Sequence, residues 1–308
     1  MSMSADLVDP LAYYARQSVI STPGAQAPLF AELPADIPAL CYIVQGLLMH
    51  YREGDLYHFE IADERKREVD IRFVEPLLAR IRALDPQPLP VMRAPGDRVV
   101  CCCRDFALLL CAMLRHRGVP ARVRFGFSRY FDPDFDPDFA CDHVVCEYWR
   151  ADERRWVLVD AQQDSLHRDL NKLTFDPYDL PRDQFLTAGA AWALCRAGQA
   201  DADSFGYAKV PDLRGWLVLR HYLVHELAAL NGMELLIWDL WGVAEVEESD
   251  LTEEHRALLD RVAIITEASN DAFLTLRSTY QHNADLRVPA QVTSWSPATR
   301  DRRMVAMG

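Results

Sequence analysis

The 308-residue sequence lacks several features that would assign it to common classes of protein. No two cysteines are separated by two residues, a spacing that usually marks structural zinc. Acidic residues outnumber basic ones by 46 to 33, whereas a nucleic-acid-binding protein needs a basic surface to neutralise phosphates. No apolar run is long enough to span a bilayer. We therefore expect neither a nucleic acid nor a membrane as a partner.

The first 26 residues also lack the basic start and apolar core of a secretory signal. Eight cysteines without such a signal are most simply free thiols in a reducing compartment. The composition is 50% apolar and 26% charged, which is typical of a globular protein that buries a full core. The sequence thus predicts a cytoplasmic protein without disulfide bonds.

The segment that carries chemistry begins at Cys103, in Cys-Arg-Asp-Phe-Ala. Residues 106–114 are all apolar, and a helix that is apolar on every side belongs in a core. Basic residues then suit the negative end of the helix dipole, and Gly118 and Pro120 are stop signals. Cys103 is therefore predicted in the first turn of a buried helix, where free N–H groups and the helix dipole lower a thiol pKa.

Two later segments supply a histidine and an acid. His143 opens an apolar segment typical of a strand, and Asp160 ends a second strand at residues 155–159, after a turn-like sequence at 151–154. A hairpin of this kind would bring His143 and Asp160 together. The carboxylate would fix the imidazole tautomer, and the imidazole would activate the thiol. The pattern predicts Cys103 as nucleophile, His143 as general base and acid, and Asp160 as the residue that orients His143.

These segments resemble the transglutaminase-like superfamily of papain-type thiol enzymes. The resemblance lies within residues 99–164, in the order Cys, His, Asp and in the motifs Cys-x-Asp-Phe-Ala, Gly-Val-Pro-Ala-Arg and Trp-Val-Leu-Val-Asp. It implies the same three roles, and an α+β fold in which a buried nucleophile helix packs on an antiparallel sheet. Val144 and Val145 depart from many relatives, which place a tryptophan next to the histidine; this concerns the acyl-binding slot and not the triad.

A thiol acyl transferase also needs hydrogen-bond donors for the oxygen of its tetrahedral intermediate. The backbone N–H of Cys103 is the default donor. The resemblance suggests a side-chain amide upstream of the nucleophile, and Gln45, within a predicted helix at residues 39–52, is so placed. The alternative is that Gln45 is a partly exposed glutamine without a role in catalysis.

Three other clusters suggest metal binding at first sight. Cys141 could join the cysteines at 101–103 in a zinc site, but the usual spacing is missing. The acidic segment 132–138 lacks the glycine and final glutamate of an EF-hand, so we expect an exposed loop. His221 and His225 lie four residues apart without the glutamate of a metalloprotease helix, which favours core or lid histidines. We expect no metal and no cofactor.

The sequence divides into four regions. Residues 1–98 form an irregular arm followed by helices at 39–52 and 69–84, and residues 99–165 form the catalytic core. Within the core, alternation at 121–130 predicts a half-buried strand. Residues 166–285 are mainly helical and 286–308 an irregular tail; the helices are expected at 182–196, 214–230, 251–268 and 270–282, the third opened by a capping pattern at Asp250.

Together these features predict cysteine-dependent acyl transfer or hydrolysis at an amide or thioester carbonyl, through a thioester acyl-enzyme. The substrate would be a small-molecule, peptide or carrier-bound acyl group, and amide-bond formation in a biosynthetic pathway is one such reaction. The helical C-terminal region favours a restricted pocket, with apolar lining available from Trp192, Trp216, Trp238 and Trp241. The alternatives are an intracellular cysteine peptidase or amidase, and a non-catalytic binding module of the same fold.

Overall fold

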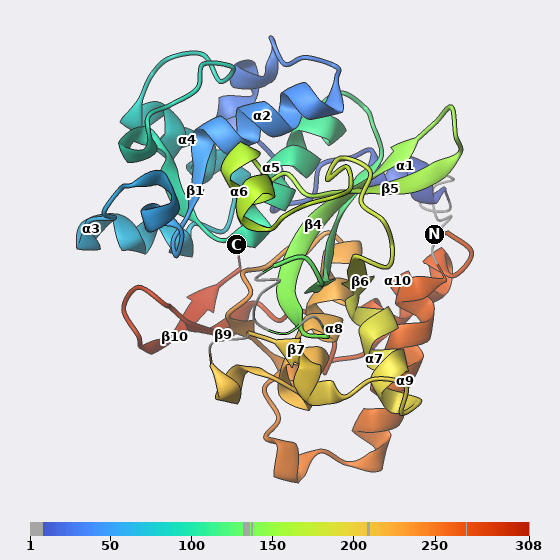
Figure 1. The fold of residues 1–308 in the computed structure, drawn as a ribbon. Coiled ribbons are helices and arrows are strands. Elements are labelled where there is room, and N and C mark those ends of the chain that lie inside the picture. Colours follow the sequence, from blue (N-terminus) through green and yellow to red (C-terminus); the bar gives the residue numbers. More distant parts are fainter. Residues whose placement is uncertain (1–8, 132–135, 137, 208–209, 269, 308) are drawn as a thin grey trace.

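The computed structural model describes residues 9–307 apart from 132–135, 137, 208, 209 and 269, and its fold is α+β (Figure 1). Among the described helices, none is both long and apolar enough to cross a bilayer. The helices are α1 Pro10–Tyr14, α2 Ile37–Leu47, α3 Asp63–Lys66, α4 Val74–Leu84, α5 Cys103–His116, α6 Ser165–Leu170, α7 Ala188–Arg196, α8 Trp216–Leu230, α9 Glu253–Glu267 and α10 Phe273–His282. The strands are β1 Leu48–His50, β2 Val99–Cys101, β3 Ala121–Ser128, β4 Ala140–Arg150, β5 Arg155–Val159, β6 Phe185–Thr187, β7 Phe205–Gly206, β8 Asp239–Leu240, β9 Gln291–Trp295 and β10 Arg302–Ala306.

The central sheet lies between two groups of helices. Its antiparallel strands run in the order β5-β4-β3-β6, and β7 pairs in parallel with the start of β4. Helices α2, α4 and α5 lie on one side, and α7, α8 and α9 on the other (Figure 1). Strands β6 and β7 come from beyond residue 165, so the sheet that carries the candidate site also draws on the C-terminal region. The predicted nucleophile helix on an antiparallel sheet is confirmed.

Helix α5 is buried along almost its whole length, including its charged residues. The fully buried guanidinium of Arg104 donates to the carbonyl oxygen of Glu234 at 2.8 Å and pairs with Asp105 at 2.6 Å. Arg115 pairs with the carboxylate of Glu234 at 2.8 Å. Buried charges must be paired to be tolerated, and here Glu234, in the loop after α8, pairs with the buried arginines of α5.

Both helices predicted in the N-terminal region, at 39–52 and 69–84, extend beyond the helices in the structure. Helix α2 ends at Leu47, and the residues that follow it form β1, which pairs in parallel with β2 so that His50 lies opposite Cys101. The hydrogen bonds of this pairing are non-local, and apolar spacing along residues 39–52 does not reveal them. Helix α4 begins only at Val74, after a short 3-10 turn at Arg67–Asp70.

The prediction of a half-buried strand at β3 is wrong, because all eight of its residues are buried. Helices α7 and α8 cover β3 on the side away from α5. Alternation of Val123 and Phe125 with Arg122 and Arg124 suggests a solvent-exposed polar face, but both arginines lie in the interior.

The C-terminal region contains strands that the sequence pattern does not reveal. Residues 182–196 contain β6 before α7 begins, because a three-residue strand pairs with β3. The prediction of an irregular tail at 286–308 is wrong as well. Strands β9 and β10 form an antiparallel hairpin, and β9 also pairs with β8. Helix α9 is capped by Thr252, whose side chain accepts from the backbone of His255, and not by Asp250.

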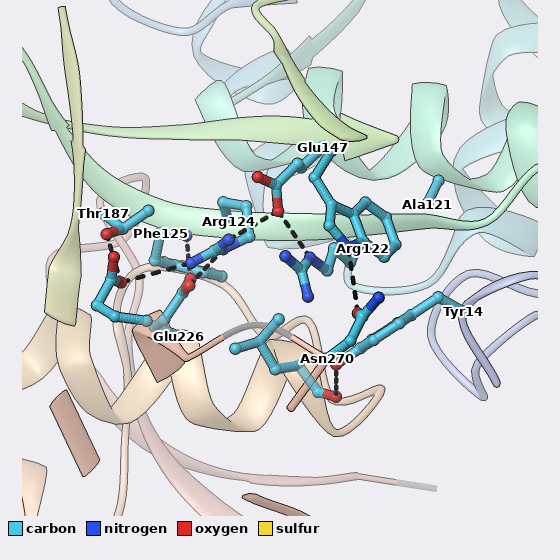
Figure 2. A network of polar contacts seen from close by, with 12 residues as sticks. Tyr14, Ala121, Arg122, Arg124, Phe125, Glu147, Thr187, Glu226 and Asn270 are labelled. Atoms are coloured by element: carbon cyan, nitrogen blue, oxygen red, sulfur yellow. Dashed lines mark hydrogen bonds and ion pairs between the residues drawn. The ribbon is translucent and has the colours of Figure 1, made fainter. Parts of the chain in front are cut away.

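Figure 2 shows how the two buried arginines of β3 are neutralised. Glu147 of β4 accepts from Arg122 and from Arg124, each at 2.7 Å, and also pairs with Arg182. Arg124 pairs with Glu226 of α8, whose carboxylate also accepts from the backbone N–H of Phe125 at 2.6 Å. This network joins the sheet to the C-terminal helices.

Removing the shared carboxylate should destabilise the fold. In Glu147→Gln, buried arginines lose their counter-charge, and breaking a buried ion pair costs about 3–5 kcal/mol. We expect the free energy of unfolding, measured in guanidinium chloride, to fall by that order. Glu153→Gln is the matched control, because Glu153 also binds two arginines but at the exposed β4–β5 turn. A control that loses as much stability as Glu147→Gln would contradict this account.

Candidate active site

Cys103 is the first residue of α5 and the most accessible of the three consecutive cysteines. Its relative exposure is 6%, against 1% for Cys101 and 0% for Cys102. The free N–H groups at this helix end favour a negative charge on sulfur. Of the triplet, Cys103 is therefore the thiol best placed to react.

His143 of β4 lies between Cys103 and Asp160. Its Nε2 is 2.9 Å from Oδ2 of Asp160. Its ring is close enough to the Cys103 thiol for each group to shift the pKa of the other. Because Asp160 engages Nε2, Nδ1 is the ring nitrogen left for the thiol. The structure thus brings the three predicted residues together, with His143 hydrogen-bonded to Asp160.

Asp160 directly follows β5 and is held by three donors. Its Oδ2 also accepts from the Tyr130 hydroxyl at 2.7 Å, and its Oδ1 accepts from the backbone N–H of Gln162 at 3.0 Å. Burial would raise the pKa of Asp160, but the neighbouring His143 and these hydrogen bonds hold it below its usual range. The carboxylate is therefore ionised and fixed in orientation.

The surroundings favour an ion pair between the thiol and the imidazole. A hydrogen bond from Cys102, opposed by burial and assisted by His143, lowers the pKa of Cys103 to about 7. Burial would lower the pKa of His143, but the Asp160 carboxylate and Cys103 raise it to about 10. These opposite shifts favour a thiolate on Cys103 and an imidazolium on His143, the protonation states that nucleophilic attack and proton donation require.

Aromatic rings enclose the imidazole. Phe131 contacts the His143 ring edge-on with centroids 4.7 Å apart, and Tyr130 and Phe185 lie at 6.3 and 6.4 Å. His143 itself is 2% exposed. Shielding from water strengthens the electrostatic coupling of the His143 imidazole with the Asp160 carboxylate and with the Cys103 thiol.

A second polar network adjoins the site and was not predicted. Glu53, in the loop after β1, accepts from the Gln162 side chain at 2.8 Å and binds Nε2 of His167 at 2.9 Å. His167 Nδ1 lies 2.7 Å from Asp164, which also accepts from the Tyr57 hydroxyl at 2.8 Å. The network anchors the loop after β1 to Gln162, the residue whose backbone holds Asp160. The sequence pattern predicted a helix at 39–52, so it did not reveal β1 or the loop that carries Glu53.

A cleft of about 370 Å³ lies along the segment after β1, and none of Cys103, His143 and Asp160 lines it. Its wall begins at Tyr51, whose backbone N–H donates to the carbonyl of Cys101 at 2.8 Å. The guanidinium of Arg52 stacks on the ring of Tyr207, 4.0 Å from its centroid. The remaining lining comes from the segment after β1 and from α3: Gly54, Asp55, Phe59, Glu60, Ile61, Ala62, Asp63 and Lys66.

Gln45 lies on α2 and is 6% exposed. The alternative expectation of a partly exposed glutamine is therefore wrong about its exposure. Its side chain lies beside Tyr178. The amide nitrogen of Gln45 is buried without a hydrogen-bond partner among the described residues. Its role as an oxyanion donor stays a prediction.

The other predicted clusters have structural surroundings. His221 and His225 bind the backbone oxygens of Ile237 and Asp239 through Nε2, at 2.7 and 2.9 Å. No group of three or more histidine, cysteine or acidic residues in the described ranges could hold a metal ion. Most of the acidic segment 132–138 lies outside the described residues.

The four tryptophans mostly pack within the fold. Trp241 is buried, donating to the carbonyl of Leu286, and Trp192 contacts Trp216. Trp238 is the one that adjoins the candidate site, because it packs in the same apolar cluster as Cys102 and contacts Tyr51.

Comparison with known families agrees with the resemblance seen in the motifs. Residues 84–161 match the family model described as the transglutaminase-like superfamily, which covers about a quarter of the chain. The matched stretch contains Cys103, His143 and Asp160, so the whole candidate site lies within the part of the chain that is similar to this superfamily. No curated protein and no solved structure matches the chain.

The pKa of His143 gives a direct test of its pairing with Asp160. Asp160→Asn removes the negative charge that favours the imidazolium, and such a neighbour is worth about 1–3 pKa units. We expect the His143 pKa, about 10 in the native protein, to fall by that amount when its ring resonances are followed by NMR. His255, on the exposed start of α9, is the internal control. An unchanged His143 titration would show that Asp160 does not govern the imidazole.

Proposed function

We propose that this protein catalyses acyl transfer or hydrolysis at an amide or thioester carbonyl, with Cys103 as nucleophile, His143 as general acid and base, and Asp160 as the residue that orients His143. The observation that supports this most directly is the hydrogen bond between His143 and Asp160 beside a thiol at the first residue of a helix, whose pKa the imidazole lowers. A buried structural cysteine would need neither the imidazole nor the helix N-terminus.

In the first half-reaction, the Cys103 thiolate attacks the carbonyl carbon and forms a tetrahedral oxyanion. The His143 imidazolium then gives its proton to the departing amine or thiol, and the carbonyl re-forms as a thioester on Cys103. The backbone N–H of Cys103 faces the oxyanion, and we propose the unpartnered amide of Gln45 as a second donor.

In the second half-reaction, His143 accepts a proton from water or from an amine as that nucleophile attacks the thioester. Release of Cys103 as a thiolate completes the cycle. Asp160 keeps the imidazole in the orientation that both proton transfers need, because three donors fix the carboxylate itself. Its substitution should therefore affect kcat more than KM.

We propose a small or carrier-bound acyl group as the substrate. Cys103 is only 6% exposed, so a substrate would have to reach the thiol through a narrow approach. An open groove for an extended polypeptide would expose the nucleophile more. We place the reaction in the cytoplasm, where the eight free thiols would stay reduced.

The triad can be tested with small acyl thioesters and hydroxylamine, which traps the acyl-enzyme as a hydroxamate. We expect Cys103→Ala and His143→Ala to abolish turnover, and Asp160→Asn to lower kcat by roughly 10²–10⁴. Cys195→Ala, which removes a buried thiol from α7, controls for loss of a cysteine. Full activity in Cys103→Ala or His143→Ala would rule out the mechanism.

The size of the substrate can be tested separately with a casein-like protein and a labelled primary amine. Because the nucleophile is nearly buried, we expect neither digestion nor labelling of the protein, alongside hydroxamate from the small thioesters. Labelled casein without hydroxamate would show that the natural substrate is a polypeptide. Inertness in both assays, together with slow alkylation of every thiol, would favour the binding-module alternative.

The proposed chemistry requires no metal, since thiolate, imidazole and backbone donors supply each step. We expect EDTA treatment to leave turnover and helical content, measured by circular dichroism, unchanged. Elemental analysis of the untreated protein is the companion measurement. Stoichiometric zinc whose removal abolishes turnover would instead favour the cluster of Cys141 with the cysteine triplet.

A further inference from the structure

We propose that Glu53 is a positioning residue of the candidate site, which holds Gln162 in place and thereby fixes the Asp160 carboxylate. Oε1 of Glu53 accepts from the side-chain amide of Gln162 at 2.8 Å, and the backbone N–H of Gln162 donates to Oδ1 of Asp160 at 3.0 Å. The consequence for turnover rests on the proposed function, whereas the effect on the pairing of His143 with Asp160 does not.

Gln162 is the link between the two carboxylates. It is 2% exposed, and its backbone and its side chain donate to different acids. Because a carboxylate only accepts hydrogen bonds, the Glu53 contact fixes which end of the Gln162 amide faces it. Gln162 comes only two residues after Asp160, so a shift of its side chain also moves the backbone donor that orients the Asp160 carboxylate.

Glu53 is itself held by an imidazole that two acids share. Nε2 of His167 lies 2.9 Å from Oε2 of Glu53, and its Nδ1 lies 2.7 Å from Oδ1 of Asp164. Only an imidazolium can donate from both ring nitrogens. Burial would lower the pKa of His167, but the hydrogen bonds to Asp164 and Glu53 raise it to about 9. His167 is therefore charged at neutral pH and fixes Glu53 by a charge-assisted hydrogen bond.

The same network fixes one wall of the cleft. Residues Gly54–Tyr57 form a short 3-10 helix, and its first two residues line the cleft. Tyr57, at the far end, donates to Asp164 at 2.8 Å, and Glu53, just before the helix, binds His167. The segment 162–167 thus supports both the cleft wall and the carboxylate that precedes it in the chain.

This support matters because the Asp160 carboxylate has little else to fix its rotation. The torsion that turns an aspartate carboxyl group is broad, so hydrogen bonds decide its orientation. Oδ2 accepts from Tyr130 and engages His143, whereas Oδ1 accepts from the backbone of Gln162. A displaced Gln162 would let the carboxylate turn and would weaken its hydrogen bond to the imidazole.

The test is Gln162→Met in the full-length protein, which removes the side-chain hydrogen bond to Glu53 but changes no charge and little volume. The His143 pKa, followed by NMR, should fall by about 0.5 pKa unit, because weakening one hydrogen bond to a charged group shifts a pKa on this scale. With small acyl thioesters, kcat should fall about tenfold, since a small misplacement of a reacting group is costly. KM should change little, because His167 and Tyr57 still hold the cleft wall.

Gln163→Met is the matched control. Gln163 is fully buried, and its side-chain oxygen accepts from Asn171, at the end of α6, at 3.1 Å. Its substitution also removes one buried side-chain hydrogen bond, but one that leads away from Glu53. Both the His143 pKa and kcat should stay native in this variant.

Should Gln162→Met fail to fold, two variants of Glu53 give the same comparison. Glu53→Gln and Glu53→Met both lose the negative charge, but only the glutamine keeps an oxygen that can accept from Gln162. We therefore expect kcat to be about tenfold lower in Glu53→Met than in Glu53→Gln.

A native His143 pKa or a native kcat in Gln162→Met overturns the proposal. Equal changes in Gln163→Met, or equal kcat values in the two Glu53 variants, overturn it as well. The NMR titration needs no substrate, so its result is independent of the proposed reaction. If the His143 pKa falls as expected while the native protein turns over no amide or thioester, the positioning role of Glu53 stands and the proposed function fails.

Discussion

The architecture depends on the burial of helix α5, because Cys103, the proposed nucleophile at its first residue, is held in place only if the rest of the helix is rigid. Its apolar residues are covered by the sheet and by α2, but Arg104 and Arg115 are buried with them. Both arginines are satisfied by Glu234, through its carbonyl and its carboxylate. The loop after α8 is therefore part of the support of the nucleophile, although it lies more than a hundred residues later in the chain.

Three segments of the chain each supply one side chain of the candidate site. The start of α5 provides the thiol, β4 provides the imidazole, and the end of β5 provides the carboxylate. The antiparallel pairing of β4 with β5 fixes the distance between His143 and Asp160, whereas the packing of α5 on β4 fixes the distance to Cys103. A slip of β4 by one residue would turn His143 away from both Cys103 and Asp160, so fold and site are specified together.

The elements predicted correctly from the sequence are those with a local signal. Helix α5 has a continuous apolar run with stop residues, and the β4–β5 hairpin has a polar turn between apolar strands, so Cys103, His143 and Asp160 could be placed in advance. Strands β1, β6 and β9 are short and owe their conformation to distant partners, which periodicity cannot reveal. For the same reason the sequence did not predict Glu53 and His167 as parts of the site: each is an ordinary polar residue until the pairing of β1 brings Glu53 beside both Gln162 and His167.

The charge of the protein explains why hydrogen bonds matter so much at this thiolate. The chain carries a net charge of −13, and Asp142, next to His143, acts to raise the pKa of Cys103. Asp160, Glu53 and Asp164 add further negative charge to the same region, of which His143 and His167 balance only part. A thiolate in such a field gains little from long-range electrostatics. The proposed thiolate would therefore depend on short-range donors, namely the helix N–H groups and the imidazolium, which the buried start of α5 and the neighbouring strand β4 bring to it.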